Sequence, residues 1–83
     1  LIKTMHIKPI GANQTEVTLA NGSIVLFSYE TPVACYSNDD GKYYKTNMKW
    51  SKTTSKHINA WLEGVIAASV SQSELNDIIK TNQ

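Results

Sequence analysis

The sequence contains no arginine and a single cysteine, and each shortage excludes a class of protein. One cysteine, Cys35, cannot form an internal disulfide framework or a zinc site built from cysteine ligands. Base-specific reading of a duplex relies on arginine that contacts guanine through two hydrogen bonds, so the lack of arginine argues against it. The longest apolar-rich stretch without a charge, residues 64–73, includes three serines and a glutamine. It is far short of the roughly 20 apolar residues of a membrane span, so we expect no membrane partner.

The residues that are present indicate one small domain over residues 1–83. A chain of 83 residues buries only about 60% of its extended surface, which supports one modest core. Apolar residues make up 41% and charged residues 18%, with a net charge of +1. This balance excludes a disordered charged tail. The chain shows no leader with a basic start and an apolar centre, so we expect a protein that is not exported.

The first half of the sequence predicts an antiparallel meander. Asn21 and Gly22 both tolerate positive φ and predict a two-residue hairpin turn. In the register set by that turn, the facing pairs are Ala20–Ser23, Leu19–Ile24, Thr18–Val25, Val17–Leu26 and Glu16–Phe27. The strand that follows Gly22, the second of this hairpin, then carries apolar residues on both faces, so we expect packing on both sides of it.

Three further strands complete the expected meander. Residues 3–10 form the first, and Pro9 places it at an edge because proline cannot donate a ladder hydrogen bond. Residues 33–36 form another strand, and residues 37–41 carry turn chemistry. Residues 42–46 then return as a strand with Tyr43 and Tyr44 on opposite faces.

The second half changes to a helical period. One apolar stripe is formed at i, i+3, i+4 and i+7 by Ile58, Trp61, Leu62 and Val65. We expect an N-cap oxygen from Thr53, Thr54 or Ser55 and a left-handed end at Gly64.

A further strand and a second helix follow. Residues 65–70 predict the strand, and Ser71 with Glu74 forms a capping box. The buried stripe of the helix is then Leu75, Ile78 and Ile79. We therefore predict an α+β domain, a curved antiparallel meander of about five to six strands with two short helices, in the order β-β-β-β-β-α-β-α.

Three segments resemble a family of small uncharacterised phage proteins. They are FSYETPVA at residues 27–34, YKT at 44–46 and WSKTTSKHINAWL at 50–62. The pattern F-S-Y-x-T-P-V-A … Y-x-T … [WY]-S-x-T-T-x-x-H-I-N-x-[WF]-L covers residues 24–62 well and the rest loosely. The resemblance implies a phage or mobile-element origin and a bacterial host cytoplasm, and it identifies no reaction.

The lysines are concentrated in one segment. Five of the eight fall within residues 42–56, which contain no acid, and three aromatic residues are interleaved with them. Lysines attract phosphates, aromatic rings stack on unpaired bases, and the amides of a helix N-terminus can hold an anion. The alternative is a solvated edge that keeps sheets from pairing. The candidate nucleic-acid or anion site is Lys42, Tyr43, Lys45, Lys49, Trp50, Lys52, Thr53, Thr54, Lys56 and His57. Such a site requires the side-chain amines of the five lysines to lie close together at the N-terminus of the first helix.

His57 lies on the same helical side as Thr53 and Thr54. A functional interpretation makes it a general base or an anion-binding imidazole. The other interpretation is a boundary histidine that hydrogen-bonds a cap residue and orders the helix start. We favour the second, since local spacing places no carboxylate nearby.

The sequence predicts no metal site and no cofactor. His6 and His57 are distant in sequence, and His6 is expected to be exposed beside Lys8. Residues 38–41 lack the alternating ligands and the terminal glutamate of a calcium loop. Cys35 lies in an apolar stretch, where cysteine usually acts as a small hydrophobe.

Our first functional hypothesis is a non-enzymatic binding module for nucleic acid, tolerant of sequence, that uses the lysine-rich aromatic segment. The second is a protein-binding modulator or inhibitor of a host bacterial factor, because interfaces of that kind favour Tyr and Trp over Lys. The third is an enzyme that uses His57. The oligomeric state stays open.

Overall fold

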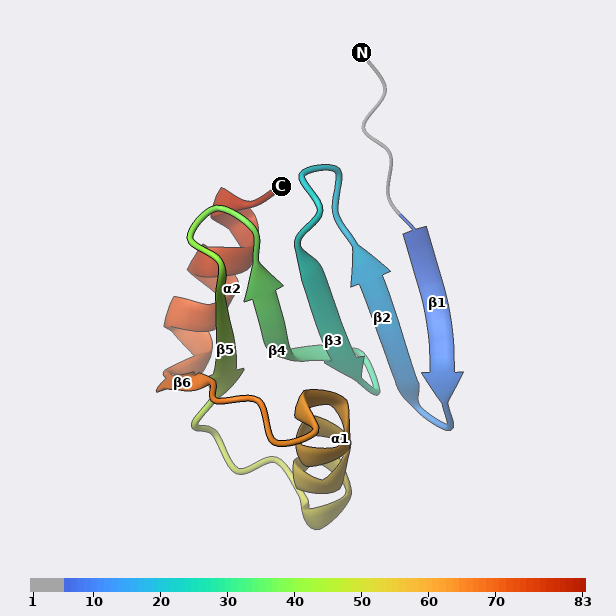
Figure 1. The fold of residues 1–83 in the computed structure, drawn as a ribbon. Coiled ribbons are helices and arrows are strands. Elements are labelled where there is room, and N and C mark those ends of the chain that lie inside the picture. The colour runs from blue at the N-terminus through green and yellow to red at the C-terminus, as the bar shows by residue number, and fades with distance from the viewer. Residues whose placement is uncertain (1–5) are drawn as a thin grey trace.

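The computed structural model describes residues 6–83, which form a single sheet with a helix on each face (Figure 1). The elements in this range are β1 (His6–Gly11), β2 (Gln14–Thr18), β3 (Ile24–Ser28), β4 (Thr31–Ser37), β5 (Lys42–Thr46), α1 (Lys52–Leu62), β6 (Ala68–Val70) and α2 (Gln72–Thr81). The strands lie in the sheet in chain order. The α+β class and the order β-β-β-β-β-α-β-α are thereby confirmed.

The sheet is antiparallel from β1 to β5, but β6 pairs with β5 in parallel. The predicted antiparallel meander is therefore present from β1 to β5, and β6 departs from it. The reason is that α1 forms the crossover between β5 and β6, and parallel neighbours need such a long connection. The strand expected over residues 65–70 is also shorter, because Val65 and Ile66 lie outside β6 with exposed side chains.

The predicted register of the β2–β3 hairpin was wrong by one residue. Thr18 pairs with Ile24 and Val17 pairs with Val25. The loop spans three residues, 20–22, and is closed by the Leu19 amide, which donates to the Ser23 carbonyl at 2.7 Å. Within the loop Gly22 has a φ of 91°, a conformation that glycine adopts readily. A slip of one residue exchanges the two faces of a strand, so Val17 shares a face with Val25 rather than with Leu26.

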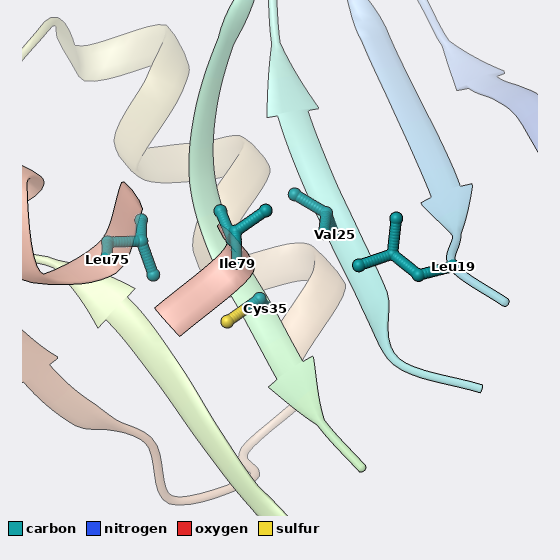
Figure 2. Packing of buried hydrophobic residues seen from close by; sticks show 5 residues of the cluster. All are labelled: Leu19, Val25, Cys35, Leu75 and Ile79. Carbon is teal, nitrogen blue, oxygen red and sulfur yellow. The ribbon is translucent and has the colours of Figure 1, made fainter. Parts of the chain in front are cut away.

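Apolar residues on the two faces of the sheet form two separate core clusters. On one face, α2 packs through Leu75 and Ile79 against the cluster members Leu19, Val25 and Cys35, all shown in Figure 2. On the other face, α1 packs Ile58 and Leu62 against the cluster members Leu26, Val33 and Ala34. Neighbouring residues of β3 thus point into different clusters. The prediction that this strand is covered on both sides is confirmed.

The start of α1 differs from the expected one. The N-cap is Ser51, whose Oγ accepts a hydrogen bond from the Thr54 amide at 3.1 Å, and Thr53 lies inside the helix. Ser51 stands three residues before that amide, which is the spacing a capping oxygen needs. The helix ends at Leu62, and Glu63 and Gly64 both have positive φ.

The N-cap and the packing predicted for α2 are confirmed, with the Ser71 hydroxyl half of the capping box present. Ser71 is the N-cap, and its Oγ accepts from the Glu74 amide at 3.1 Å. Leu75 and Ile79 are buried, with Ile78 packed against the same cluster.

The C-terminal end of α2 is tied to the sheet by Asn82, which is 4% exposed. Its Oδ1 accepts from Asn21 Nδ2 at 2.8 Å and from Ser23 Oγ at 2.9 Å. Its Nδ2 donates to Ser37 Oγ at 3.0 Å and to the Ile78 carbonyl at 2.9 Å. This one amide therefore joins the β2–β3 loop, the end of β4 and the end of α2.

β1 forms one edge of the described sheet, and each of its residues is exposed. Pro9 lies opposite Thr15 in this edge strand, as predicted. His6 and Lys8 are exposed as expected. Residues 3–5 of the predicted first strand lie outside the described residues.

Candidate nucleic-acid interface

Four lysines line two adjoining hollows at the start of α1. Lys45 and Lys49 line the smaller hollow, of about 280 Å³, together with Ser55 and Asn59. Lys49, Lys52 and Lys56 line the larger, of about 550 Å³. Because Lys49 and Ser55 belong to both, the two hollows form one surface feature. We call it the lysine groove and define it by Lys45, Lys49, Trp50, Lys52, Ser55 and Lys56.

The fold explains why these lysines meet. Lys45 is on the α1 face of β5, opposite Ala34, a member of the cluster beneath that helix. The chain then leaves β5 through residues 47–51, and the Asn47 amide donates to the Val70 carbonyl at 2.7 Å. Lys52 and Lys56 are four residues apart on α1 and therefore lie on one side of it. The groove is thus assembled by a strand, a connecting segment and the first turns of a helix.

Trp50 lies in the groove with 48% of its surface exposed. Its Nε1 donates to Gln72 Oε1 at 3.3 Å. Gln72 is held in turn, since its Nε2 donates to the Pro32 carbonyl at 2.8 Å and to Asn76 Oδ1 at 3.1 Å. The indole is therefore anchored by its N–H edge while about half of the residue stays accessible.

Lys42 lies away from the groove. It begins β5 opposite Ser37, about 10 Å along the strand from Lys45. Its amide donates to Asp40 Oδ1 at 3.1 Å. A hydrogen bond from the Tyr44 hydroxyl is the main cause that lowers the pKa of the Asp40 carboxyl, and the charge of Lys42 adds to it. Lys42 thus lies near the Asp40 carboxylate at the other end of the strand, and the two hollows bring together the other four of the five lysines.

Tyr43 is also not part of the groove. Its ring packs against Tyr36, with centroids 4.9 Å apart, and edge-on against Trp61 at 6.0 Å. It is a half-buried member of the α1-side packing rather than a free stacking surface.

His57 and Thr54 are buried between α1 and β3 instead of facing the groove. His57 Nδ1 lies 2.8 Å from Ser28 Oγ, and that oxygen lies 3.0 Å from Thr54 Oγ1. Ser51 Oγ donates to Thr54 Oγ1 at 3.2 Å, which extends the chain of hydrogen bonds to the helix cap. The expected cap contact of His57 is therefore indirect, through Ser28. Thr53 is exposed on α1 and does not line the groove.

The Ser28–His57 pair has the residue types of a nucleophile and its base, but not the accessibility. Ser28 is 2% exposed and His57 is 8% exposed. A nucleophilic hydroxyl has to reach a substrate, so the pair is better suited to holding α1 on the sheet. Sequence spacing did not reveal the pair because its members are 29 residues apart.

A family of unknown function (DUF8033) matches the sequence over residues 5–77. The chain belongs to that family. The match runs from β1 into α2, so the family shares nearly the whole fold rather than the groove alone. No curated protein and no solved structure matches this chain.

Cys35 is part of the α2-side cluster and is 2% exposed, which agrees with its predicted role as a small hydrophobe. Burial is the main cause that raises the pKa of its thiol from 9.0 to about 11, with a further contribution from the charge of Asp40. The thiol of this family member is therefore protonated at neutral pH and acts as a small core side chain.

Among residues 6–83, no three or more His, Cys, Asp and Glu side chains gather as metal ligands would. Neither helix in the described range has the length and apolar character needed to cross a membrane.

Proposed function

We propose that this protein is a non-enzymatic binding module that binds nucleic acid without sequence preference through the lysine groove. The observation that carries the proposal is the meeting of Lys45, Lys49, Lys52 and Lys56 along one groove. The segment that supplies them contains no acidic residue. Lysine ammonium groups bind phosphates as point charges, without the forked geometry by which arginine reads bases.

Salt dependence tests the proposal quantitatively. If the four groove lysines each neutralise one phosphate, the slope of log affinity against log salt is about −2.8 for single strands and about −3.6 for duplex. The measurement is a salt titration with random-sequence oligonucleotides of both kinds. Absence of binding at low salt would remove the proposal.

A matched pair of variants distinguishes the effect of the groove on binding from the effect of net charge. The triple variant Lys49→Gln, Lys52→Gln and Lys56→Gln removes three groove charges. The control variant Lys8→Gln, Lys42→Gln and Lys80→Gln removes three charges elsewhere, so both variants carry a net charge of −2, from five lysines and seven acids. We expect the first to lose most of the affinity and of the salt slope. The control should retain both, and equal losses would show that the groove has no special role.

The resemblance of residues 27–34, 44–46 and 50–62 to phage proteins supports a further part of the proposal. We place this chain among accessory proteins of a phage or mobile element, acting in the cytoplasm of a bacterial host.

A second candidate function is modulation or inhibition of a host protein through the same surface. It is favoured by Met48 and Trp50, which are 49% and 48% exposed beside the lysines and are residue types enriched in interfaces. Capture of host protein that survives nuclease treatment would support this candidate, whereas capture that nuclease abolishes would support nucleic-acid binding.

A further inference from the structure

A hydrogen bond from Trp50 Nε1 to Gln72 Oε1 favours one orientation of the indole before any ligand arrives. Both donors of the Gln72 side-chain amide are engaged, one by the Pro32 carbonyl and one by Asn76 Oδ1. The amide oxygen is thereby aimed at Trp50 Nε1. The Pro32 carbonyl of β4 and Asn76 of α2 therefore hold the Gln72 side chain, and Gln72 in turn orients the indole of Trp50.

The hydrogen bond to Gln72 also determines what Trp50 can offer a ligand. Its N–H is already used, so the remaining accessible part is the apolar ring. A planar ring held in place loses little conformational entropy when a second ring stacks on it. Stacking of a base on an aromatic side chain is tolerant of sequence because every base has a π-face.

The neighbours of the ring indicate which ligand would supply that second ring. Trp50 shares the larger hollow with Lys49, Lys52 and Lys56. Phosphates on the amines would therefore lie beside a base on the indole. In a duplex the bases are stacked on one another and their faces are closed to such a contact, whereas an unpaired base is free to make it.

We infer that the lysine groove selects single-stranded nucleic acid, with one unpaired base stacked on Trp50 and with Gln72 as the positioning residue for that ring. The inference rests on the proposed function and adds the class of ligand to it. Phosphate contacts by the lysines supply affinity for any strand, and the stacked base supplies the preference for a single strand.

Three oligonucleotides of equal length test the inference by fluorescence anisotropy at low salt. They are single-stranded oligothymidylate, its duplex with oligoadenylate, and an abasic single strand that has the phosphates without the bases. We expect the full-length protein to bind the thymidylate strand more tightly than either of the others. Trp50→Ala should weaken binding of the thymidylate strand by about 5- to 150-fold and leave binding of the abasic strand unchanged.

Variants separate stacking from a structural effect. Trp50→Phe, which keeps a ring, should retain most of the base-dependent affinity. Gln72→Ala should lower the affinity for the thymidylate strand but not for the abasic strand. Val65→Ala is the matched control, because Val65 is 43% exposed, close to the 48% of Trp50, has no aromatic ring and lines neither hollow of the groove. It should leave the affinity for all three oligonucleotides unchanged.

Tryptophan emission supplies a second measurement. The chain has two tryptophans, and Trp61 is held in the packing by a hydrogen bond from its Nε1 to Glu16 Oε1 at 2.9 Å. Binding of the thymidylate strand should therefore quench emission in the wild type, and this quenching should disappear in Trp50→Ala.

The results that overturn the inference differ from those that overturn the proposed function. Equal affinity for the thymidylate and abasic strands, or a preference for the duplex, rejects base stacking while nucleic-acid binding stands. A loss in Trp50→Ala that is as large on the abasic strand as on the thymidylate strand also rejects it. Failure to bind any of the three oligonucleotides rejects both.

Discussion

Replacement of Asn82 by alanine should destabilise the protein strongly for a single polar substitution. Its side chain makes four hydrogen bonds, to Asn21, Ser23, Ser37 and the Ile78 carbonyl. Asn82 thereby links the β2–β3 loop and the end of β4 to the end of α2.

The magnitude follows from the groups that lose their partner. Ser23 and Ser37 are 1% and 2% exposed, so water cannot easily replace the amide of Asn82. A buried polar group without a partner costs about 1–3 kcal/mol, and hydroxyl rotation recovers part of this. We therefore expect the free energy of unfolding to fall by about 2–4 kcal/mol, out of a typical total of about 5–15 kcal/mol.

Urea unfolding measures this change, with Gln83→Ala as the control because the side chain of Gln83 is exposed. A surface substitution of this kind should stay within about 0.5 kcal/mol of the wild type. Asn82→Ala and Ser37→Ala should also be non-additive, since the two side chains share a hydrogen bond. If Asn82→Ala unfolds within about 0.5 kcal/mol of the wild type, the network does not carry the stability assigned to it.

Two further predictions concern buried polar groups on the two faces of the sheet. Ser28→Ala should lower the free energy of unfolding in urea by about 1–3 kcal/mol, because it leaves His57 and Thr54 without their shared partner; an unchanged value would contradict the role of the pair. Burial raises the pKa of the Cys35 thiol from 9.0 to about 11, so the unfolded chain loses this proton first as pH rises. Stability supplied by the protonated thiol is therefore present below pH 9.0 and is lost between pH 9.0 and about 11. Unfolding at several pH values should show a steeper decline over that range in the wild type than in Cys35→Ala, and parallel curves would contradict it.

Features that depend on three or four neighbouring residues were predictable from the sequence. The Ser71 cap of α2 and the turn before β5 were both correct because the interactions that define them are local. The cap of α1 was placed too late, at Thr53 to Ser55, although Ser51 met the same spacing rule. The apolar stripe alone did not show where that helix begins.

The register of the β2–β3 hairpin could not be predicted from neighbouring residues alone. Asn21-Gly22 is compatible with loops of two and of three residues, and the two choices place opposite faces of β2 in the core. In the structure Asn21 contacts Asn82, 61 residues away, and its Oδ1 accepts from the Ser23 amide at 2.9 Å. These contacts accompany the longer loop, and one of them involves a residue that no local pattern connects to the hairpin.

For the candidate site, the sequence located the lysine-rich segment but did not show which of its residues line the groove. Lys49, Lys52 and Lys56 are close in the chain and stay close in the fold. Lys42 separates from them because an extended strand advances about 3.3 Å per residue. The anchoring of Trp50 by Gln72 spans 22 residues and was not foreseen.

The sequence by itself determined the class of fold, the order of elements, the α2 cap and a lysine-rich segment without acids, because these depend on composition and on spacing within one element. Only the tertiary structure decided the hairpin register, the parallel direction of β6, the burial of His57 against Ser28 and the separation of Lys42 from the groove. Each of those depends on which distant residues the sheet brings within hydrogen-bonding or packing distance, and periodicity along the chain carries no information about that.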